Sequence, residues 1–436
     1  MSRVDRASRI LSLAGVVFLA FVLGAWVAWG EGALFRSGLR PSFIGLTALL
    51  RNLEEPERQD HERIPHHVVT LDAARASAGL TLVVVGQGAH LLDLDGTIRH
   101  TWHLDYDGLR DGKELLAKTP REDLLHWRPA RVLPNGDLLA VVALWGGSPE
   151  GLALVRMDRD SKPVWIYHGH VHHDFDVAPD GRIFVLGQAV RDRVPAEIPN
   201  LPVPFIDDRL LIVSAQGTLL REISIMDAFA RSPYRTFVNR EAALRRYTRG
   251  EYLHTNDVDL VSAKAAARFP FAREGQVLIS VRDLSMLAVL DVDREQIVWA
   301  RRGEWLDQHD PDFLENGNLL VYDNAGDLAR GGRTRIIEYD PRTGAIVWQY
   351  PGPGGRDIFN RIRGDQQRLP NGDVLINDYA GRSLLEVTRG GDIVWELANG
   401  FALPGSALWY DQVSYTERYA PGALRFTFNE GRVAPR

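Results

Sequence analysis

The sequence predicts an all-β fold, a six-bladed β-propeller, preceded by one N-terminal transmembrane helix. Segments that alternate between apolar and polar residues begin near residue 80 and are separated by Gly and Asp turns, which is typical of strands. Trp299, Trp348 and Trp395 each end such a strand group, at spacings of 49 and 47 residues. A repeat of this length with about four strands is typical of a propeller blade, and we count six copies.

The first copy comprises strands at 80–85, 89–94 and 98–103, and four later copies share a turn with Gly after Asn or Asp, at residues 134–136, 179–181, 315–317 and 370–372. Blades that stack around a ring bury both sheet faces, so we interpret the Trp residues as packing between blades. The stretch Leu424–Phe428 alternates like a strand, and we expect it to close the ring beside the first copy. Insertions at Val190–Asp208 and Ser224–Tyr252 interrupt the pattern, and we interpret them as functional lids or caps.

The segment Ile10–Trp29 carries no charge over 20 residues. A helix of that length rises about 30 Å, the thickness of the hydrocarbon core of a bilayer. Arg3, Arg6 and Arg9 precede it, which predicts a cytoplasmic N-terminus. A cleaved signal peptide is the alternative, but the apolar run is long for one and no Ala-x-Ala cleavage pattern follows, so a retained anchor is favoured.

These features predict three parts: residues 1–30 as cytoplasmic N-terminus and signal-anchor, 31–65 as linker, and 66–436 as the propeller catalytic domain. The expected location is the cell inner membrane, single-pass, with the propeller on the periplasmic, exported side. A formal net charge of −6 and the lack of a long basic run argue against nucleic acid as a partner. The absence of cysteine excludes disulfides, thiolate metal sites and cysteine nucleophiles.

Histidines recur just before the inner strands of the predicted blades, where side chains point into one mouth of the central channel. The set, read copy by copy from the second to the sixth, is His126, then His172 and His173, then His254, then His309, then Gln366. A single histidine at a strand start usually has a structural role, but four blades with histidine at one position predict a shared site. Converging imidazoles can form a metal site, a proton shuttle or a nucleophile, and the lack of a close-spaced ligand pair disfavours the metal.

Arg282 follows the apolar strand Val277–Val281, so it lies at a strand end that can face the channel. An arginine in that place can bind an oxyanion through two hydrogen bonds. A salt bridge to Asp283 or to another blade is the structural alternative.

Four segments together resemble the bacterial arylsulfotransferase family, whose members move sulfuryl groups without a nucleotide donor. The segments are His173-Asp174-Phe175-Asp176, His254-Thr255-Asn256-Asp257-Val258, Ile279 to Arg282, and Gln308-His309-Asp310 with Asp323-Asn324. The resemblance covers about residues 80 to 400 and implies a six-bladed propeller in which histidines and one arginine hold the sulfate. It also implies that His309 is the histidine that is transiently sulfated.

The sequence departs from that family in three ways. An apolar segment stands where well-studied members have an N-terminal β-sandwich, no cysteines are present to form the disulfide of some members, and an insertion rich in Ala and Phe separates His254 from Arg282. These differences bear on the substrate and the acceptor more than on the fold.

The resulting hypothesis is a sulfotransferase that moves a sulfuryl group from an aryl sulfate ester to a phenolic acceptor through a sulfohistidine intermediate. His309 is the expected nucleophile, His254 and Arg282 offset charge, and His173 is the general acid and base. The expected substrate-binding residues are His172, His126, Asn256 and Asn324, with no metal and no nucleotide cofactor. The alternatives are a non-catalytic, membrane-anchored propeller that binds a ligand or serves as a scaffold, and a metal-dependent lyase or hydrolase.

Overall fold

The computed structural model describes residues 63–104, 125–144, 149, 151–244, 250–404 and 408–428. The chain separates into two compact units, Met1–Arg58 and Gln59–Arg436, and all described residues belong to the second. The predicted transmembrane segment Ile10–Trp29 lies outside the described residues. Within the described ranges, none of the helices has both the length and the apolar character needed to cross a bilayer.

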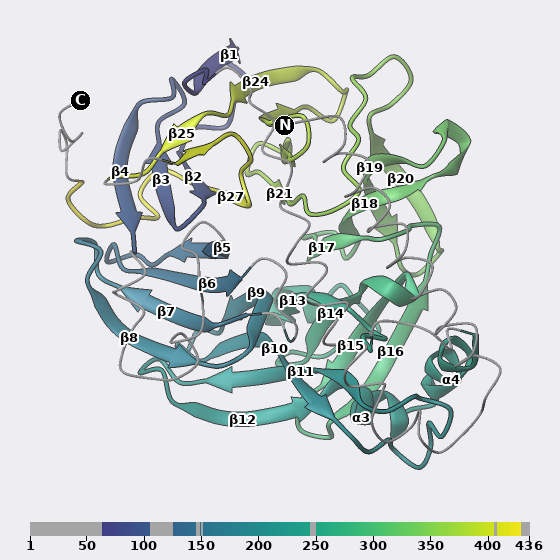
Figure 1. Cartoon of the computed structure of the whole chain (residues 1–436). Coiled ribbons are helices and arrows are strands. Elements are labelled where there is room, and N and C mark those ends of the chain that lie inside the picture. The colour runs from purple at the N-terminus through teal and green to yellow at the C-terminus, as the bar shows by residue number, and fades with distance from the viewer. Residues whose placement is uncertain are drawn as a thin grey trace, which may run out of the picture. The chain divides into compact units, whose positions relative to one another are not determined.

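Six antiparallel sheets form the blades of a ring, as Figure 1 shows, which confirms the predicted six-bladed propeller. Blades 1 to 3, each written from the inner strand outward, are β27 (Tyr415–Tyr419), β2 (Leu80–Val85), β3 (Gly88–Leu92) and β4 (Ile98–His103); β5 (Leu125–Val132), β6 (Leu138–Leu144), β7 (Ala153–Met157) and β8 (Pro163–His168); and β9 (Val171–Val177), β10 (Ile183–Arg191), β11 (Phe205–Val213) and β12 (Leu219–Ser224).

Blades 4 to 6, in the same order, are β13 (Thr255–Leu260), β14 (Val277–Val281), β15 (Met286–Asp291) and β16 (Gln296–Arg302); β17 (His309–Phe313), β18 (Leu319–Asp327), β19 (Arg333–Asp340) and β20 (Ala345–Tyr350); and β21 (Gln366–Arg368), β22 (Val374–Asp378), β23 (Ser383–Val387), β24 (Ile393–Ala398) and β1 (His67–Leu71). A separate two-stranded pair consists of β25 (Phe401–Ala402) and β26 (Trp409–Tyr410).

The ring closes twice, because β27 pairs with β2 in blade 1 and β1 pairs with β24 in blade 6. The expectation that Leu424–Phe428 closes the ring is therefore wrong: that stretch forms no strand, and the closing strand is Tyr415–Tyr419. The alternating side chains of Leu424–Phe428 pack instead over blades 1 and 2, where the Phe426 ring lies 6.0 Å from the Trp102 ring. Gly136 permits this approach, since a Cβ there would lie 2.6 Å from Phe426.

Tryptophans of the outer strands join neighbouring blades, as their spacing predicts. The indole nitrogen of Trp102 donates to the carbonyl oxygen of Gly136 in blade 2 at 3.2 Å, and that of Trp395 donates to Leu94 in blade 1 at 2.8 Å. Apolar clusters fill the spaces between blades, with residues from adjacent sheets in each cluster. The core is therefore divided among the blade interfaces, which leaves the central channel to polar residues.

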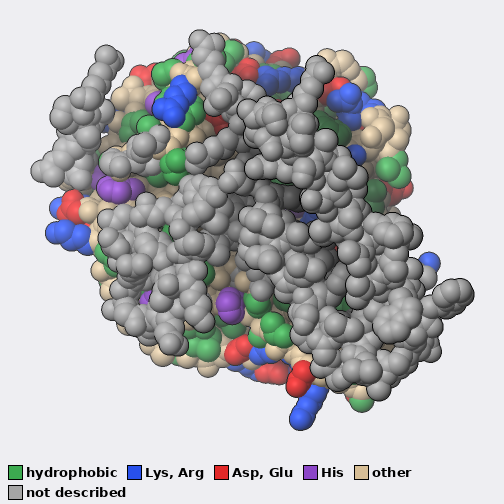
Figure 2. Space-filling view, in the orientation of Figure 1, with side chains coloured by type: hydrophobic (Ala, Val, Ile, Leu, Met, Phe, Trp, Pro, Cys, Tyr) green, Lys and Arg blue, Asp and Glu red, His purple; other side chains and the backbone are tan. Residues whose placement is uncertain are grey.

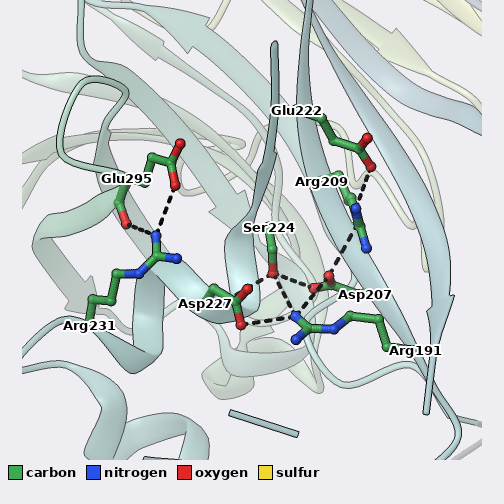
Figure 3. A network of polar contacts seen from close by, with 8 residues as sticks. All are labelled: Arg191, Asp207, Arg209, Glu222, Ser224, Asp227, Arg231 and Glu295. Carbon is green, nitrogen blue, oxygen red and sulfur yellow. Dashed lines mark hydrogen bonds and ion pairs between the residues drawn. The ribbon is translucent and has the colours of Figure 1, made fainter. Parts of the chain in front are cut away.

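The two predicted insertions pack on blades 3 and 4. The first joins β10 to β11, and the second contains α3 (Ile225–Ala230) and α4 (Arg235–Leu244); the remaining short helices are α5 (Ala263–Ala266), η4 (Arg282–Leu284) and η5 (Leu328–Arg330). Arg191 donates to Asp207, Ser224 and Asp227, so one guanidinium ties the first hairpin to the start of α3 (Figure 3). The role of the two insertions as lids or caps stays a prediction.

Charged side chains of both signs are interspersed on the face that Figure 2 shows, among the described residues visible there. Blue Lys and Arg groups and red Asp and Glu groups alternate around its edge rather than gathering by sign. On the visible part of this face the described charges therefore form no large patch of a single sign.

Candidate active site

The inner strands of blades 2 to 5 each contain a register irregularity that shapes the mouth of the channel. The shifts lie at Trp127/Ala130, opposite β9 at Val185/Gly187, at Thr255/Asp257 and at His309/Asp312. Successive side chains of a regular strand point to opposite faces, and a β-bulge re-aims one of them. Consecutive residues such as His173 and Asp174, or His309 and Asp310, can therefore line the same cavity, whereas in a regular strand they would point to opposite faces.

This cavity has a volume of about 60 Å³ and collects residues from blades far apart in the sequence. Its lining includes Arg128, His173, Asp174, Asn256, Asp257, His309, Asp310, Arg363, Asp365 and Tyr415. A water molecule needs roughly 10–15 Å³ by this measure, so the space holds about four waters. A sulfuryl group, one sulfur with three oxygens, is small enough for this space.

Several lining residues have backbone conformations that non-glycine residues seldom adopt. His173 has φ 54°, Asp310 has φ 50° and Arg363 has φ 60°, and the neighbouring His254 and Asp307 have φ 49° and 54°. Such conformations cost about 1–3 kcal/mol each and persist where the surroundings enforce them, often at functional sites. Their concentration at one mouth makes that mouth the candidate for the functional end of the channel.

His309 is held in one orientation and one tautomer. Its Nδ1 lies 2.8 Å from Oδ1 of Asn324 and 2.9 Å from the carbonyl oxygen of Asp307. The Asn324 amide nitrogen donates to the carbonyl oxygens of Asn360 and Arg363, which fixes Oδ1 as the acceptor. Both partners of Nδ1 are acceptors, so Nδ1 carries the hydrogen and Nε2 carries the lone pair.

The electrostatic surroundings keep His309 neutral. Part of its side chain faces the cavity, but protein surrounds the ring, and burial lowers its pKa to about 3. The hydrogen bond to Asn324 opposes that shift, while the charges of Arg282 and His254 add to it. At neutral pH the imidazole is therefore unprotonated at Nε2, the state that a nucleophile requires.

His254 is in the opposite state. Its Nδ1 lies 3.0 Å from Oε2 of Glu251. Burial alone would lower the pKa of His254, but the charge of Glu251 and its hydrogen bond outweigh burial and raise that pKa to about 9. Gln188 donates to Glu251 at 2.8 Å and holds the carboxylate in place. The site thus contains an imidazolium cation at neutral pH.

His173 lies beside His254, lines the same cavity as His309, and is neutral. Its ring centroid is 4.9 Å from that of His254, and its Nδ1 is 2.5 Å from Nδ1 of His172. Burial, followed by the charge of Arg128, lowers the pKa of His173 well below its ordinary value. At neutral pH this ring is therefore in the form that accepts a proton, because little of it is present as the imidazolium that could donate one.

Arg282 follows strand β14 as predicted, and it contacts the loop that bears His309. Its Nη1 donates to Oδ1 of Asp283 at 3.0 Å, and its Nη2 lies 3.5 Å from Oδ1 of Asp307. The salt bridge to Asp283 that the sequence allowed is therefore formed. Arg282 is not among the cavity-lining residues, although its charge lowers the pKa values of both His254 and His309.

The remaining predicted site residues separate into two groups. Asn256 lines the cavity, and its amide nitrogen donates to the carbonyl oxygen of Gln308 at 2.8 Å. His172, His126 and Asn324 are buried outside the lining, and of these Asn324 positions His309. A role in substrate binding for these residues stays a prediction.

The sequence interpretation missed Arg128, Arg363, Glu251 and Asp257. One signal was available: Arg128 stands eight residues before the turn glycine of its blade, as His173 and His309 do, whereas His126 stands ten before it. Glu251 precedes a strand in an insertion and follows no repeat position, so only the fold reveals its pairing with His254. No described group of three or more His, Asp or Glu side chains has the arrangement of a metal site.

Comparison with solved structures finds distant relatives. A protein of unknown function from Bacteroides caccae is 14% identical, with coverage of 73% of this chain and 93% of that one and a TM-score of 0.46. A streptogramin B lyase is 9% identical, with 77% and 88% covered and a TM-score of 0.38. A virginiamycin B lyase from Staphylococcus aureus is 10% identical, with 75% and 86% covered and a TM-score of 0.38. At these scores the likenesses carry no argument about function.

Comparison of sequences gives a clearer result. No curated protein matches the chain. The family model described as arylsulfotransferase (ASST) matches residues 148–400, which is more than half of the 436 residues and includes β9, β13 and β17.

Proposed function

The chain belongs to the arylsulfotransferase (ASST) family, and on this premise we propose that it moves a sulfuryl group from an aryl sulfate ester to a phenolic acceptor through a sulfohistidine intermediate on His309. The family implies small-molecule aryl substrates. The observation that supports the sulfohistidine step is the pair of hydrogen bonds from Nδ1 of His309 to Asn324 and Asp307, which we call the clamp. It leaves an unprotonated Nε2 on a ring that lines a cavity large enough for a sulfuryl group.

In the first half-reaction, Nε2 of His309 attacks the sulfur of the donor. The bond between sulfur and the phenolic oxygen breaks, and the phenoxide leaves with that electron pair. A phenol has a pKa near 10, so this leaving group needs little assistance compared with an alkoxide. The sulfuryl group fits the cavity of about 60 Å³, and the aromatic ring of the donor extends toward its open side.

The charged residues around His309 stabilise the transferring group. The cationic His254 lies beside the His173 ring that lines the cavity, and Arg282, which follows β14 outside the lining, contacts Asp307 on the loop before His309. Fixed positive charge beside the sulfuryl oxygens lowers the barrier in the way that it does in phosphoryl transfer. His254 keeps its proton because Glu251 pairs with it.

In the second half-reaction, the acceptor phenol loses its proton and attacks the sulfur. The bond between sulfur and Nε2 breaks, and the electron pair returns to His309. His173 is neutral and lines the same cavity, which suits the role of the base that takes the acceptor's proton. The acid role expected of the same residue in the first half-reaction suits it less, since its ring holds no readily released proton.

The test of the proposed function is transfer by the full-length protein from 4-nitrophenyl sulfate to phenol. His309→Ala should lower the rate at least about 10⁴-fold, because the covalent route is lost. His67→Ala is the matched control, since His67 is exposed on β1 and stands apart from the cavity lining. Turnover that survives in His309→Ala would remove the nucleophile from the proposal.

We also propose that Ile10–Trp29 anchors the protein in the inner membrane with the propeller exported. The apolar length and the arginines before the segment support this. A C-terminal alkaline phosphatase fusion should be active in cells, because that reporter requires export. An inactive fusion that is nevertheless present at full length would contradict the topology.

A further inference from the structure

Aspartates on or next to the inner strands fasten blades 3, 5 and 6 to the next blade of the ring. Oδ2 of Asp174 accepts from the amide of Val258 at 3.1 Å, Oδ2 of Asp310 from Gln366 at 2.7 Å, and that of Asp365 from Thr416 at 2.9 Å. In each case the donor is the residue that follows the equivalent repeat position in the next blade. A carboxylate that accepts an otherwise unpaired backbone amide stabilises the interface of two blades.

A second layer of the channel follows the same rule. Oδ2 of Asp176 accepts from the amide of Leu260 at 2.9 Å, and Oδ2 of Asp259 accepts from Phe313 at 3.2 Å. The acidic residues of the channel therefore share a structural role. Their number alone is no sign of a bound cation.

Asp257 breaks the rule. Its repeat position is that of Asp174 and Asp310, so its donor should be residue 311, which follows Asp310 in blade 5. That residue is Pro311, and proline has no amide hydrogen. Oδ2 of Asp257 makes no hydrogen bond with any described residue, although the side chain is only 4% exposed. An unpaired buried carboxyl oxygen is costly in free energy, and Asp257 has no backbone donor in the next blade to offset that cost.

The free oxygen belongs to a residue of the active-site cavity. Asp257 lines that cavity together with His173 and His309, on an inner strand whose bulge at Thr255/Asp257 re-aims its side chains. Pro311, which removes the structural partner, lies two residues after the proposed nucleophile. Asp257 thus lacks the hydrogen bond to the next blade and also lies in the active-site cavity.

We propose that Asp257 is a further catalytic residue, whose protonated carboxyl donates its proton to the phenolic oxygen that leaves in the first half-reaction. The inference rests on the proposed function and assigns to Asp257 the acid role that His173 does not suit. The chemical partner is the bridging oxygen of an aryl sulfate donor.

The proton balance over the two half-reactions closes without a further reactant. In the first, the S–O bond breaks as the S–N bond to His309 forms, and the proton of Asp257 passes to the departing phenoxide, which leaves as phenol. In the second, the acceptor phenol gives its proton to His173, and the S–N bond breaks as the new S–O bond forms. The imidazolium of His173, disfavoured by burial, returns the proton to the Asp257 carboxylate across the cavity that both line.

The electrostatic surroundings are consistent with a carboxyl that holds a proton. Burial, followed by the charges of Asp174 and Asp310, raises the pKa of Asp257 well above its ordinary value, in the direction of a phenol. Burial also raises the pKa of Asp174 to about 6, although a side-chain hydrogen bond with Asp257 lowers it. Two adjacent buried carboxyls disfavour a double negative charge, so at least one stays protonated.

The experiment compares single-turnover donor cleavage for two donors, phenyl sulfate and 4-nitrophenyl sulfate, with full-length protein. General acid catalysis contributes about 10²–10⁴-fold and matters most for a basic leaving group. Asp257→Asn should therefore slow phenyl sulfate about 100-fold or more and 4-nitrophenyl sulfate less than about 10-fold. Equal losses for the two donors, or no loss, would overturn the assignment.

Pro311→Ala is the second variant, and it leaves every carboxyl in place. The new amide hydrogen at residue 311 should bind Oδ2 of Asp257, raise the melting temperature and slow phenyl sulfate selectively. A raised melting temperature with unchanged phenyl sulfate cleavage would contradict the proposal. Asp259→Asn is the matched control, since Asp259 is a fastening residue outside the cavity lining. If the wild-type protein cleaves neither donor, the proposed function fails instead, so the two failures are distinguishable.

Discussion

His173 and His309 occupy the same repeat position in blades 3 and 5, and each precedes an aspartate that fastens its blade to the next. Their surroundings nevertheless give them different roles. Nδ1 of His309 faces two oxygen acceptors, whereas Nδ1 of His173 faces Nδ1 of His172. The two acceptors fix His309 in the tautomer that leaves the lone pair on Nε2, which is why we propose it as the nucleophile. Repeat position places a histidine in the mouth, and neighbours on other strands decide its chemistry.

His173→Ala should give the largest effect that separates the roles of His173 and His309. Donor cleavage should persist, because His309 and its clamp are intact, while transfer to phenol should fall about 10²–10⁴-fold with the loss of the base. Rapid-quench measurement separates the two half-reactions. A variant that loses donor cleavage to the same degree as His309→Ala would make the two histidines equivalent and contradict the distinction.

A smaller effect is expected from removing the clamp with Asn324→Leu. His309 keeps the Asp307 carbonyl but loses the side-chain acceptor at 2.8 Å, so both tautomers become populated. We expect kcat to fall about 10–100-fold with little change in KM, by analogy with outer partners that orient catalytic imidazoles. Asn324→Asp keeps the acceptor and should recover part of kcat. Equal kcat in both variants would show that Asn324 acts through packing alone.

The cationic state of His254 predicts a pH dependence. His309 is neutral above a pKa of about 3, and His254 is charged below a pKa of about 9. Transfer from 4-nitrophenyl sulfate, the donor that depends least on the proton of Asp257, should therefore be constant between these limits and fall as pH rises through about 9. Glu251→Gln removes the charge that holds the pKa of His254 up, and the alkaline fall should move to lower pH. An alkaline limb that stays in place in this variant would remove His254 from the charge-offsetting role.

Much of the fold was predictable, because turns and tryptophan spacing recur at blade length and strand β14 ends where the apolar run ends. The closing strand was not, since Tyr415–Tyr419 and Leu424–Phe428 both alternate and pairing with β2 decides between them. His173, His254 and His309 were predicted and are brought together. Glu251 and the unpaired Asp257 were not, because their significance depends on contacts between blades.

The smallest expected effect concerns two buried carboxyls of the channel, those of Asp174 and Asp365, which fasten blades 3 and 6 to the next blade. Burial raises the pKa values of Asp174 to about 6 and of Asp365 to about 7 in the folded protein. Because these pKa values are higher in the folded than in the unfolded protein, the two protonated carboxyls contribute stability that is fully present below about pH 4. That contribution is lost as pH rises through about 6 to 7. The melting temperature should fall by a few degrees between pH 5 and pH 8, at about 1 °C per kcal/mol for a chain of this length. Asp365→Asn should flatten that fall, and a melting temperature that rises over this range would contradict it.

The central claim, covalent catalysis by one clamped histidine, is tested most directly by mass spectrometry of the full-length protein mixed with 4-nitrophenyl sulfate and no acceptor. The account predicts a mass increase of one sulfuryl group, mapped by peptide analysis to His309, that disappears when phenol is added. An unmodified protein that still releases nitrophenol, or a sulfuryl group found on His173 or His254 instead, would contradict it.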